Sequence, residues 1–342
     1  MSPISHVLIV GSGLMGASVG LAAREAGLQV RILDKDAQRV LEASQSTGLE
    51  VHNSDFIPDL IVIATPPEQT PVEIDKALRM FPQSTVIDIA SIKTQVLNEV
   101  DTNQAGFSRF VPTHPMAGKE SSGFEHASFD LFKDRIWVVC PLDSTNPDRI
   151  TLVKEFIESL GALPFEMSAL EHDRTVAITS HVPQVVASVL AAQLLDLTDS
   201  HVQVSGQGLR DMTRIASSNP QLWSEILLAN AAFVGPLLAK ISTELAAVAQ
   251  SLSSRSPEEI SSAISRGNQG RALVPGKHGD KPTLYETVSI MIQDAPGQLA
   301  AIFAVADQAE VNVEDVRIDH ALGKAVAIVE LDVDPAKALS LR

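Results

Sequence analysis

Short apolar runs alternate with longer amphipathic segments over the first half of the chain. The runs are rich in Val, Ile and Leu and end at Gly, Asp, Pro or Ser, as buried strands of a parallel sheet do. They predict strands at residues 6–10, 29–33, 60–64, 85–89, 136–140 and 162–166, a strand entering at 110–111, and helices at 14–26 and 147–160. This alternation is typical of a Rossmann-type α/β domain with a parallel sheet, which we place at residues 1–167.

The pattern changes at about residue 169. Strand signals stop, and helical patterns rich in Ala, Leu and Val follow at residues 175–195, 223–252 and 257–265. These helices carry apolar residues on more than one face, so we expect them to bury one face against a second copy of the chain. Residues 168–270 are therefore predicted to form an all-α domain that binds substrate and makes a homodimer.

The C-terminal part has the pattern of a small α+β module. Residues 266–282, RGNQGRALVPGKHGDKP, are rich in Gly, Pro and basic residues and indicate a linker, which we bound at 271–282. Strands are predicted at 283–293, 311–318 and 325–333, with helices at 298–310 and from Pro335 onward. The module, residues 283–342, lacks a final strand and is predicted to be incomplete.

A glycine-rich turn, GSGLMG, joins the first predicted strand to the first helix. Gly11 permits the tight turn, Gly13 lets the backbone approach a pyrophosphate, and Gly16 lets the helix pack on the strand. The N–H groups at the helix start favour a phosphate there. Because strand, turn and helix follow one another, we predict a dinucleotide site at Gly11, Gly13, Leu14, Met15 and Gly16.

Asp34 follows the second predicted strand and indicates which dinucleotide is bound. A carboxylate there accepts hydrogen bonds from the ribose hydroxyls of NAD and repels the 2′-phosphate of NADP. Lys35 and Arg39 lie nearby and offer positive charge, but residues at a helix start are more often simply solvated. The sequence therefore favours NAD as the cofactor.

Three polar residues fall just past predicted strand ends: Thr65, Ser91 and His114. The carboxyl ends of parallel strands form the ligand-binding edge of an open sheet, so we expect all three at the cofactor cleft. His114 lies in a proline-flanked stretch, VPTHPMAGKE, which we interpret as a stiff loop. A histidine there suits proton transfer near neutral pH. Alone, however, His114 is more simply a loop histidine, and Ser91 is equally explained as a helix N-cap.

Two polar clusters interrupt the helical part. One comprises Glu171-His172-Asp173 and the Ser180–Gln184 stretch, and the other surrounds Arg214. A guanidinium binds a carboxylate through two parallel hydrogen bonds, so Arg214 is a candidate for holding an acidic substrate. At this stage an ion pair with Asp211 is the simpler explanation of Arg214.

Composition excludes several classes of function. The formal net charge is −16, which argues against binding nucleic acid or anionic membranes. The one cysteine, Cys140, cannot form an internal disulfide, and the Cys and His spacings do not match a metal site. No signal peptide is expected, and polar residues interrupt the apolar helical runs short of a membrane span. We therefore expect a soluble cytoplasmic protein.

Several stretches resemble the prephenate and arogenate dehydrogenases of tyrosine biosynthesis. They are GSGLMGAS near the start, IDIASIKT around Ser91, THPMAGKESSG around His114, TSHVP around His181, and GLRDMTRIASSNPQLW, which contains Arg214 and Trp223. The stretches GNQGRALVPGKHG and DAPGQLAAIF are similar to members that carry a C-terminal ACT regulatory domain. The resemblance covers nearly the whole chain and keeps the family's order and approximate spacing.

The resemblance implies an NAD-dependent oxidative decarboxylation of prephenate to 4-hydroxyphenylpyruvate. Hydride leaves the hydroxyl-bearing ring carbon, CO₂ leaves the ring, and aromatisation supplies the driving force. His114 then matches the base that takes the hydroxyl proton, Ser91 lies beside the same hydroxyl and the nicotinamide, and Arg214 binds a substrate carboxylate. The resemblance implies further pocket residues at Lys119, Glu120, Ser180, His181 and Gln184.

Two departures from the family pattern bear on substrate choice. Many prephenate-using members have a second histidine at the position of Gln184, and a neutral amide shifts the expectation toward arogenate or dual specificity. Lys119 adds positive charge near the pocket and favours prephenate instead. The ACT-like module suggests tyrosine as an effector, although its missing strand leaves ligand binding open.

Two other hypotheses fit parts of the sequence. A non-catalytic protein that senses NAD or an amino acid would keep the dinucleotide domain and the C-terminal module, but it would not need His114 and Ser91. Another NAD-dependent hydroxyacid or imine reductase would share the glycine turn and the helical part, but not the His-Pro stretch.

Overall fold

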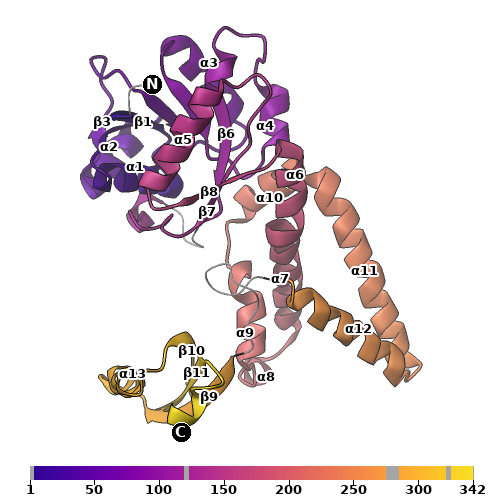
Figure 1. Cartoon of the computed structure of the whole chain (residues 1–342). Coiled ribbons are helices and arrows are strands. Elements are labelled where there is room, and N and C mark those ends of the chain that lie inside the picture. The colour runs from indigo at the N-terminus through magenta and orange to yellow at the C-terminus, as the bar shows by residue number, and fades with distance from the viewer. Residues whose placement is uncertain (1–3, 119–122, 275–284, 321–324, 342) are drawn as a thin grey trace. The chain divides into compact units, whose positions relative to one another are not determined.

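The computed structural model describes residues 4–118, 123–274, 285–320 and 325–341. An eight-stranded sheet forms the N-terminal part, with strand order β3-β2-β1-β4-β5-β6-β7-β8 (Figure 1). The strands are β1 His6–Val10, β2 Gln29–Leu33, β3 Glu50–Val51, β4 Leu60–Ile63, β5 Thr85–Asp88, β6 Phe110–Pro115, β7 Ile136–Val139 and β8 Leu163–Glu166. The Rossmann-type sheet predicted from the apolar runs is confirmed.

Helices cover both faces of this sheet because its strands are apolar on both sides. They are α1 Leu14–Glu25, α2 Ala37–Thr47, α3 Thr70–Met80, α4 Thr94–Glu99 and α5 Pro147–Ser159. Val7 and Ile9 pack with α1, α2 and α5, whereas Leu8 and Val10 pack with α3 and α4. This alternation follows from the two-residue period of a strand. It leaves the carboxyl ends of the strands as the polar edge of the domain.

His114 lies in strand β6 and not in a loop, so that detail of the prediction was wrong. The first residues of β6 pair in parallel with β5, and the last three, Thr113 to Pro115, pair with β7 in the antiparallel direction. Prolines at positions 112 and 115 weaken the strand signal, because proline donates no backbone hydrogen bond. The strand therefore extends beyond β5 and holds His114 on rigid backbone.

A helical segment follows the sheet. Its elements are α6 Ala169–Val176, η3 Ala177–His181, α7 Val182–Ala192, η4 Gln193–Asp196, α8 Asp199–Val202, α9 Gln207–Thr213, η5 Arg214–Ala216, α10 Pro220–Ala229 and α11 Ala231–Ser253. The turn η3 is a π-helix. Pro183 explains it, because a proline lacks the N–H that would continue the α-helical hydrogen bonds. The predicted helix 223–252 is interrupted at Asn230, between α10 and α11.

The chain divides into two compact units, residues 1–241 and 242–342. The second unit contains the end of α11, α12 Pro257–Arg271, β9 Glu286–Gln293, α13 Gln298–Gln308, β10 Val313–His320, β11 Val326–Val333 and η7 Ala338–Leu341. Its three strands form an antiparallel sheet in the order β10-β11-β9, packed around Val288, Val329 and Leu331. Helix α12 extends into the predicted linker region, and the predicted last helix is the short 3₁₀ turn η7.

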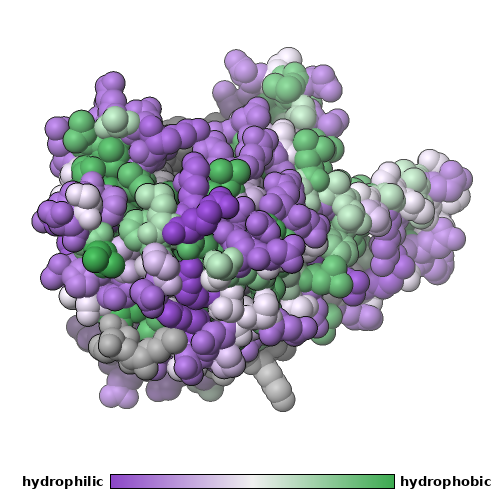
Figure 2. Space-filling model, turned by 90° about the horizontal axis from the view of Figure 1, so that it is seen from above, coloured by the Kyte–Doolittle hydropathy of each residue, from purple (hydrophilic) through white to green (hydrophobic). Residues whose placement is uncertain are grey.

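Apolar side chains are exposed along the helical segments. Leu195, Leu228, Leu245 and Ile264 are all more than 60% exposed. The face of the molecule drawn in Figure 2 is by contrast mainly hydrophilic, with scattered apolar residues, as on an ordinary protein surface. The exposed apolar residues favour the expected contact between two copies of the chain.

Two helical stretches, Ala169–Asp196 and Ala231–Ser253, are long and apolar enough to cross a membrane by length and composition alone. The expectation that polar residues rule out such stretches was therefore wrong. The interrupting residues are mostly uncharged Gln, Ser and Thr, which lower hydropathy little. The core helices and subunit-facing helices of soluble proteins meet the same criterion, so this is weak evidence for a membrane span.

Candidate active site

The glycine turn brings the start of α1 close to strand β4. Gly11 has φ +108°, and a Cβ there would lie 2.4 Å from the carbonyl oxygen of Ala64. A Cβ at Gly16 would lie 2.0 Å from the carbonyl oxygen of Gly11. Gly13, at the N-cap of α1, meets only the guanidinium of Arg39, 3.5 Å from the position of a Cβ. The turn thus allows no side chain at Gly11 or Gly16 and is open at Gly13, as a pyrophosphate requires.

Asp34 is held at the end of β2 by Ser12. The backbone N–H and the hydroxyl of Ser12 donate to the same carboxylate oxygen of Asp34, at 2.8 and 2.7 Å. Burial alone would raise the pKa of Asp34, but these hydrogen bonds and the N–H of Asp36 hold the pKa below its ordinary value. Asp34 is therefore ionised at neutral pH, as the predicted contact with ribose hydroxyls needs.

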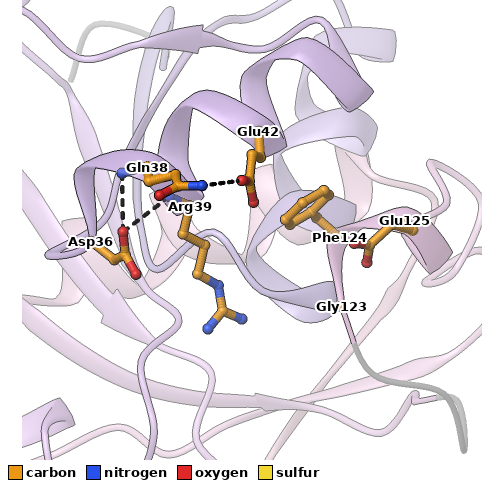
Figure 3. A pocket seen from close by; sticks show the side chains of 7 residues that line it. All are labelled: Asp36, Gln38, Arg39, Glu42, Gly123, Phe124 and Glu125. Carbon is orange, nitrogen blue, oxygen red and sulfur yellow. Dashed lines mark hydrogen bonds between the residues drawn. The ribbon is translucent and has the colours of Figure 1, made fainter.

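A hollow of about 400 Å³ lies beside the start of α2 (Figure 3). It is lined by Asp36, Gln38, Arg39 and Glu42 of α2 and by Gly123, Phe124 and Glu125. Asp36 caps α2 by accepting hydrogen bonds from the N–H groups of Gln38 and Arg39. Among the described residues that line this hollow, three are carboxylates and one is a guanidinium, so the surroundings disfavour the extra phosphate of NADP.

We predict that Asp34→Asn reduces the preference for NAD over NADP. Asparagine still accepts hydrogen bonds from Ser12 but no longer repels a 2′-phosphate, so the ratio of kcat/KM for the two cofactors falls by about tenfold or more. Steady-state rates with each cofactor measure this ratio. Asp36→Asn is the matched control, because asparagine also caps helices and the charge removed is equal; it is expected to change the ratio less. An unchanged ratio in Asp34→Asn would contradict the assignment.

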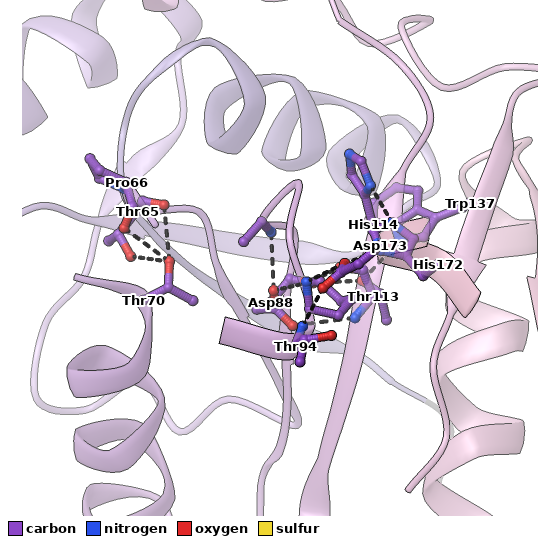
Figure 4. Close-up of polar contacts among 12 residues, drawn as sticks. Thr65, Pro66, Thr70, Asp88, Thr94, Thr113, His114, Trp137, His172 and Asp173 are labelled. Carbon is purple, nitrogen blue, oxygen red and sulfur yellow. Dashed lines mark hydrogen bonds and ion pairs between the residues drawn. The ribbon is translucent and has the colours of Figure 1, made fainter. Parts of the chain in front are cut away.

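His114 begins a row of three side chains that leads into the protein (Figure 4). Its Nδ1 lies 2.8 Å from Nε2 of His172, and Nδ1 of His172 lies 2.7 Å from Oδ1 of Asp173. His172 and Asp173 are buried, whereas His114 is partly exposed. Burial holds the pKa of His114 well below its ordinary value, and the neighbouring His172, Lys93 and His181 lower it further. His114 is therefore neutral near pH 7, as a general base must be.

Asp173 joins the helical segment to the sheet domain. Its two carboxylate oxygens accept hydrogen bonds from the backbone N–H groups of Lys93 and Thr94, at 2.9 and 2.7 Å. These N–H groups belong to the start of α4, where a helix leaves donors unpaired. Burial alone would raise the pKa of Asp173, but the hydrogen bonds from His172, Thr94 and Lys93 hold it below its ordinary value. Asp173 is therefore a buried anion beside the histidine pair.

Lys93 and Asp88 form a fully buried ion pair beneath His114. The Lys93 ammonium also donates to the carbonyl oxygen of Thr113 at 2.6 Å. Burial raises the pKa of Asp88, and Lys93 and the N–H groups of Ala90 and Thr113 oppose this. The pair thus fixes Thr113, the residue before His114, from the interior side.

His181 is a second neutral histidine, held by Asn230. The amide nitrogen of Asn230 donates to the carbonyl oxygen of Asp173 at 2.8 Å and lies 3.0 Å from Nδ1 of His181. A carbonyl oxygen only accepts, which fixes the orientation of this amide, so Nδ1 of His181 is an acceptor. Burial lowers the pKa of His181 to about 4. The hydrogen of neutral His181 is therefore on Nε2, which can donate to a ligand.

Gln184, on α7, is buried and oriented by a neighbouring loop. Its amide nitrogen donates to the hydroxyl of Ser218 at 2.7 Å. Arg214 begins η5, four residues before Ser218, and η5 packs on α7. Arg214 is exposed. The structure thus places the predicted carboxylate-binding arginine on an element that packs against the helix of Gln184.

Thr65, Ser91 and Ser180 lie at element ends or between elements of the first unit. Thr65, just past β4, accepts a hydrogen bond at its carbonyl oxygen from the buried hydroxyl of Thr70 (Figure 4). Ser91 is partly buried between β5 and α4, and the hydrogen bond of the His114 ring goes to His172 rather than to Ser91. Ser180 is partly buried in η3. The predicted residues Lys119 and Glu120 lie outside the described residues.

Sequence reasoning gave no role to His172, Asp173, Lys93 or Asn230. The stretch Glu171-His172-Asp173 stood out as a polar cluster in a helical segment, which is the signal that could have found the first two. Nothing local marks Asn230, which lies within the predicted helix 223–252.

The fold and site together define an NAD-dependent oxidoreductase with a helical second domain. Comparison with known families identifies it further: residues 19–164 match the prephenate dehydrogenase nucleotide-binding domain, and residues 168–265 match the prephenate dehydrogenase dimerization domain. The chain belongs to the prephenate dehydrogenase family. Dimerisation through the helical segment accords with this match, and NAD is the cofactor.

Similar proteins share most of their length with this chain. A probable prephenate dehydrogenase, NovF, of Streptomyces niveus is 28% identical over 98% of this chain and 95% of its own. The prephenate dehydrogenase of Bacillus subtilis is 26% identical over 91% of this chain and 87% of its own. The crystal structure of Aquifex aeolicus prephenate dehydrogenase with hydroxyphenyl propionate and NAD+ is 29% identical, with a TM-score of 0.68 over 78% of this chain and 97% of its own.

Proposed function

We propose that this protein catalyses the NAD-dependent oxidative decarboxylation of prephenate to 4-hydroxyphenylpyruvate. The observation that carries the proposal is His114, a neutral histidine on rigid strand backbone at the cofactor edge of the sheet. Membership of the prephenate dehydrogenase family supports the substrate. Bound NAD accepts the hydride, and the residues of this chain bind, orient and deprotonate the substrate.

His114 takes the proton of the ring hydroxyl as hydride leaves the same carbon. The hydroxyl loses its proton as it becomes a carbonyl, so the histidine must be unprotonated to accept that proton. Ser91, between β5 and α4, holds the hydroxyl oxygen and orients it toward His114. Loss of CO₂ from the opposite ring carbon follows, and aromatisation makes the step irreversible.

The helical segment holds the rest of the substrate. Arg214 binds a substrate carboxylate, and Nε2–H of neutral His181 and the hydroxyl of Ser180 donate to substrate oxygens. The family resemblance assigns Lys119 and Glu120 to substrate selection, because residues of opposite charge discriminate among acidic substrates. Gln184 adds no charge, which keeps arogenate as the alternative substrate.

Rates with prephenate and arogenate, measured side by side with NAD, test the choice of substrate. The proposal predicts a higher kcat/KM for prephenate. A higher value for arogenate would assign the side-chain preference to Gln184 and replace prephenate with arogenate as the substrate. The opposing effects of Lys119 and Gln184 are then separable by Gln184→His, which adds a group that can become cationic.

We predict that Arg214→Ala chiefly raises the KM for the substrate. The arginine contacts a carboxylate that is unchanged during hydride transfer, so its loss weakens ground-state and transition-state binding alike. We expect KM to rise by about tenfold or more, since a charge-assisted bidentate contact is lost. Arg210→Ala, one helical turn earlier on exposed α9, is the control. A fall in kcat with unchanged KM would contradict the assignment of Arg214.

The assembly and regulation proposed here go beyond the catalytic site. We propose a homodimer in the cytoplasm, and the exposed apolar residues of the helical segment support the dimer. The C-terminal sheet, with α13 on one face, supports an ACT-like module and tyrosine as its effector. If tyrosine inhibits, deletion of residues 283–342 separates binding at this module from competition at the active site. Inhibition that survives the deletion unchanged would assign tyrosine to the active site.

A further inference from the structure

We propose that His172 and Asp173 are positioning residues for His114, fixing its tautomer and stabilising the positive charge it acquires on taking the substrate's proton. This inference rests on the proposed function, because that function makes His114 the base. It concerns two buried residues of α6 that lie 58 or more positions from His114 in the sequence.

The direction of each hydrogen bond follows from the buried end of the row. The ionised Asp173 carboxylate only accepts, so Nδ1 of His172 donates to it. We assign His172 this one ring proton, which leaves a lone pair on its Nε2, and Nδ1–H of His114 then donates to that lone pair across 2.8 Å. The second ring nitrogen of His114, Nε2, is left without a proton. The row therefore presents a lone pair of His114 to the substrate.

The charges around His114 show why Asp173 can stabilise a positive charge formed there. His114 is faced by Lys93 from the start of α4, by His172 and Asp173 of α6, and by His181 of η3. The charge of Lys93 is balanced by Asp88, and His181 is neutral with Asn230 on its Nδ1. Asp173 bonds to the ring of His172, to which the proposal assigns one proton, so the negative charge of Asp173 is available to a cation formed at His114. In a buried site such an interaction is screened little.

Each bond that breaks in this step has a matching bond that forms. The hydroxyl O–H bond breaks, a bond from hydrogen to Nε2 of His114 forms, and the hydride leaves to the cofactor. His114 becomes an imidazolium whose Nδ1–H still donates to His172. Asp173 remains ionised and stabilises this charge through His172, as the aspartate of a hydrolase triad does for its histidine.

Asp173 also caps α4 through the N–H groups of Lys93 and Thr94, so its loss alone does not separate a catalytic effect from a structural one. Glu171→Gln is the matched control. Glu171 lies two residues earlier in the first turn of α6, is exposed, and also caps a helix start, with Ser168. Each substitution removes one negative charge and leaves an amide oxygen that can still accept at its helix start, but only the Asp173 side chain bonds to His172.

We expect Asp173→Asn to lower kcat by about 10²-fold or more, with KM and NAD affinity within about twofold of the Glu171→Gln enzyme. Loss of the anion lowers the pKa of His114, so the acid-side inflection of kcat/KM moves to lower pH. His172→Gln, which keeps an acceptor near His114 but no imidazole, should lower kcat in the same way if Asp173→Asn folds poorly. Equal kcat in Asp173→Asn and Glu171→Gln, or an unmoved inflection, overturns the proposal.

The tautomer is tested without turnover. In ¹⁵N-histidine-labelled holoenzyme, the His114 signals are identified by their loss in His114→Asn. The proposal predicts a protonated Nδ1 and an unprotonated Nε2 in the native protein, and a mixture of tautomers in His172→Gln. A protonated Nε2 in the native protein overturns it. If the native protein makes no NADH from prephenate or arogenate, the proposed function fails, whereas an active native enzyme with an equally active Asp173→Asn refutes only this inference.

Discussion

Replacing His114 with asparagine lowers kcat by about 10²–10⁴-fold, the range that a positioned general base contributes. Asparagine is similar in size and polar, but it cannot take a proton near neutral pH. The glycine turn and Asp34 lie on other strands, so NAD affinity remains near that of the native protein. Steady-state kinetics and a binding titration with NAD together measure the effect.

The pH dependence of kcat/KM tests the direction in which the pKa of His114 is shifted. Protonation of His114 removes the base, and its pKa is held well below the ordinary value near 6.5. The native kcat/KM should therefore stay constant as pH falls to 6.5 and decline only at lower pH, whereas His114→Asn shows no such decline. His320→Asn, on β10 of the second unit, is the control and should leave both kcat and the profile unchanged. A native decline centred above pH 6.5 would contradict the assigned environment of His114.

Replacing Lys93 with methionine lowers the free energy of unfolding by about 3–5 kcal/mol, the usual cost of leaving one partner of a buried ion pair alone. Lys93 and Asp88 are both fully buried, so the remaining carboxylate reaches no water. It would keep only the N–H groups of Ala90 and Thr113 as donors. Urea denaturation curves of the two proteins give the difference.

A surface ion pair provides the comparison for Lys93. Lys76 and Glu73 lie one turn apart on α3, and the Lys76 side chain is 53% exposed. Lys76→Met is expected to change the unfolding free energy by no more than about 0.5 kcal/mol. An equal change in the free energy of unfolding for both substitutions would contradict the predicted cost of breaking the buried ion pair.

The sheet domain was predicted well because short stretches of sequence determine its strands and its first turn. An apolar run ending at Gly11 and another ending at Asp34 each indicate a strand, and glycines that allow close backbone contact indicate the turn between β1 and α1. The strand bounds of β1 and β2 agree with the prediction. The position of His114 was predicted less well. Pro112 and Pro115 weaken the strand signal of β6, whose last residues pair with β7.

The candidate site depends on contacts that no local pattern reveals. His114 and His172 lie 58 residues apart in the sequence, and Lys93 and Asp173 lie 80 apart. Whether a polar residue in a helix faces solvent or another domain depends on packing, so Asp173 resembled an ordinary surface acid. The interruption at Asn230 has the same cause, because its amide binds groups on α6 and η3.

We propose that this chain oxidises prephenate with NAD and that His114 is the base. Incubating purified protein with NAD and prephenate, and following NADH together with 4-hydroxyphenylpyruvate, tests it most directly. We expect equal amounts of the two products from the native protein and a greatly reduced rate from His114→Asn. Absence of NADH with both prephenate and arogenate, or full activity in His114→Asn, would contradict it.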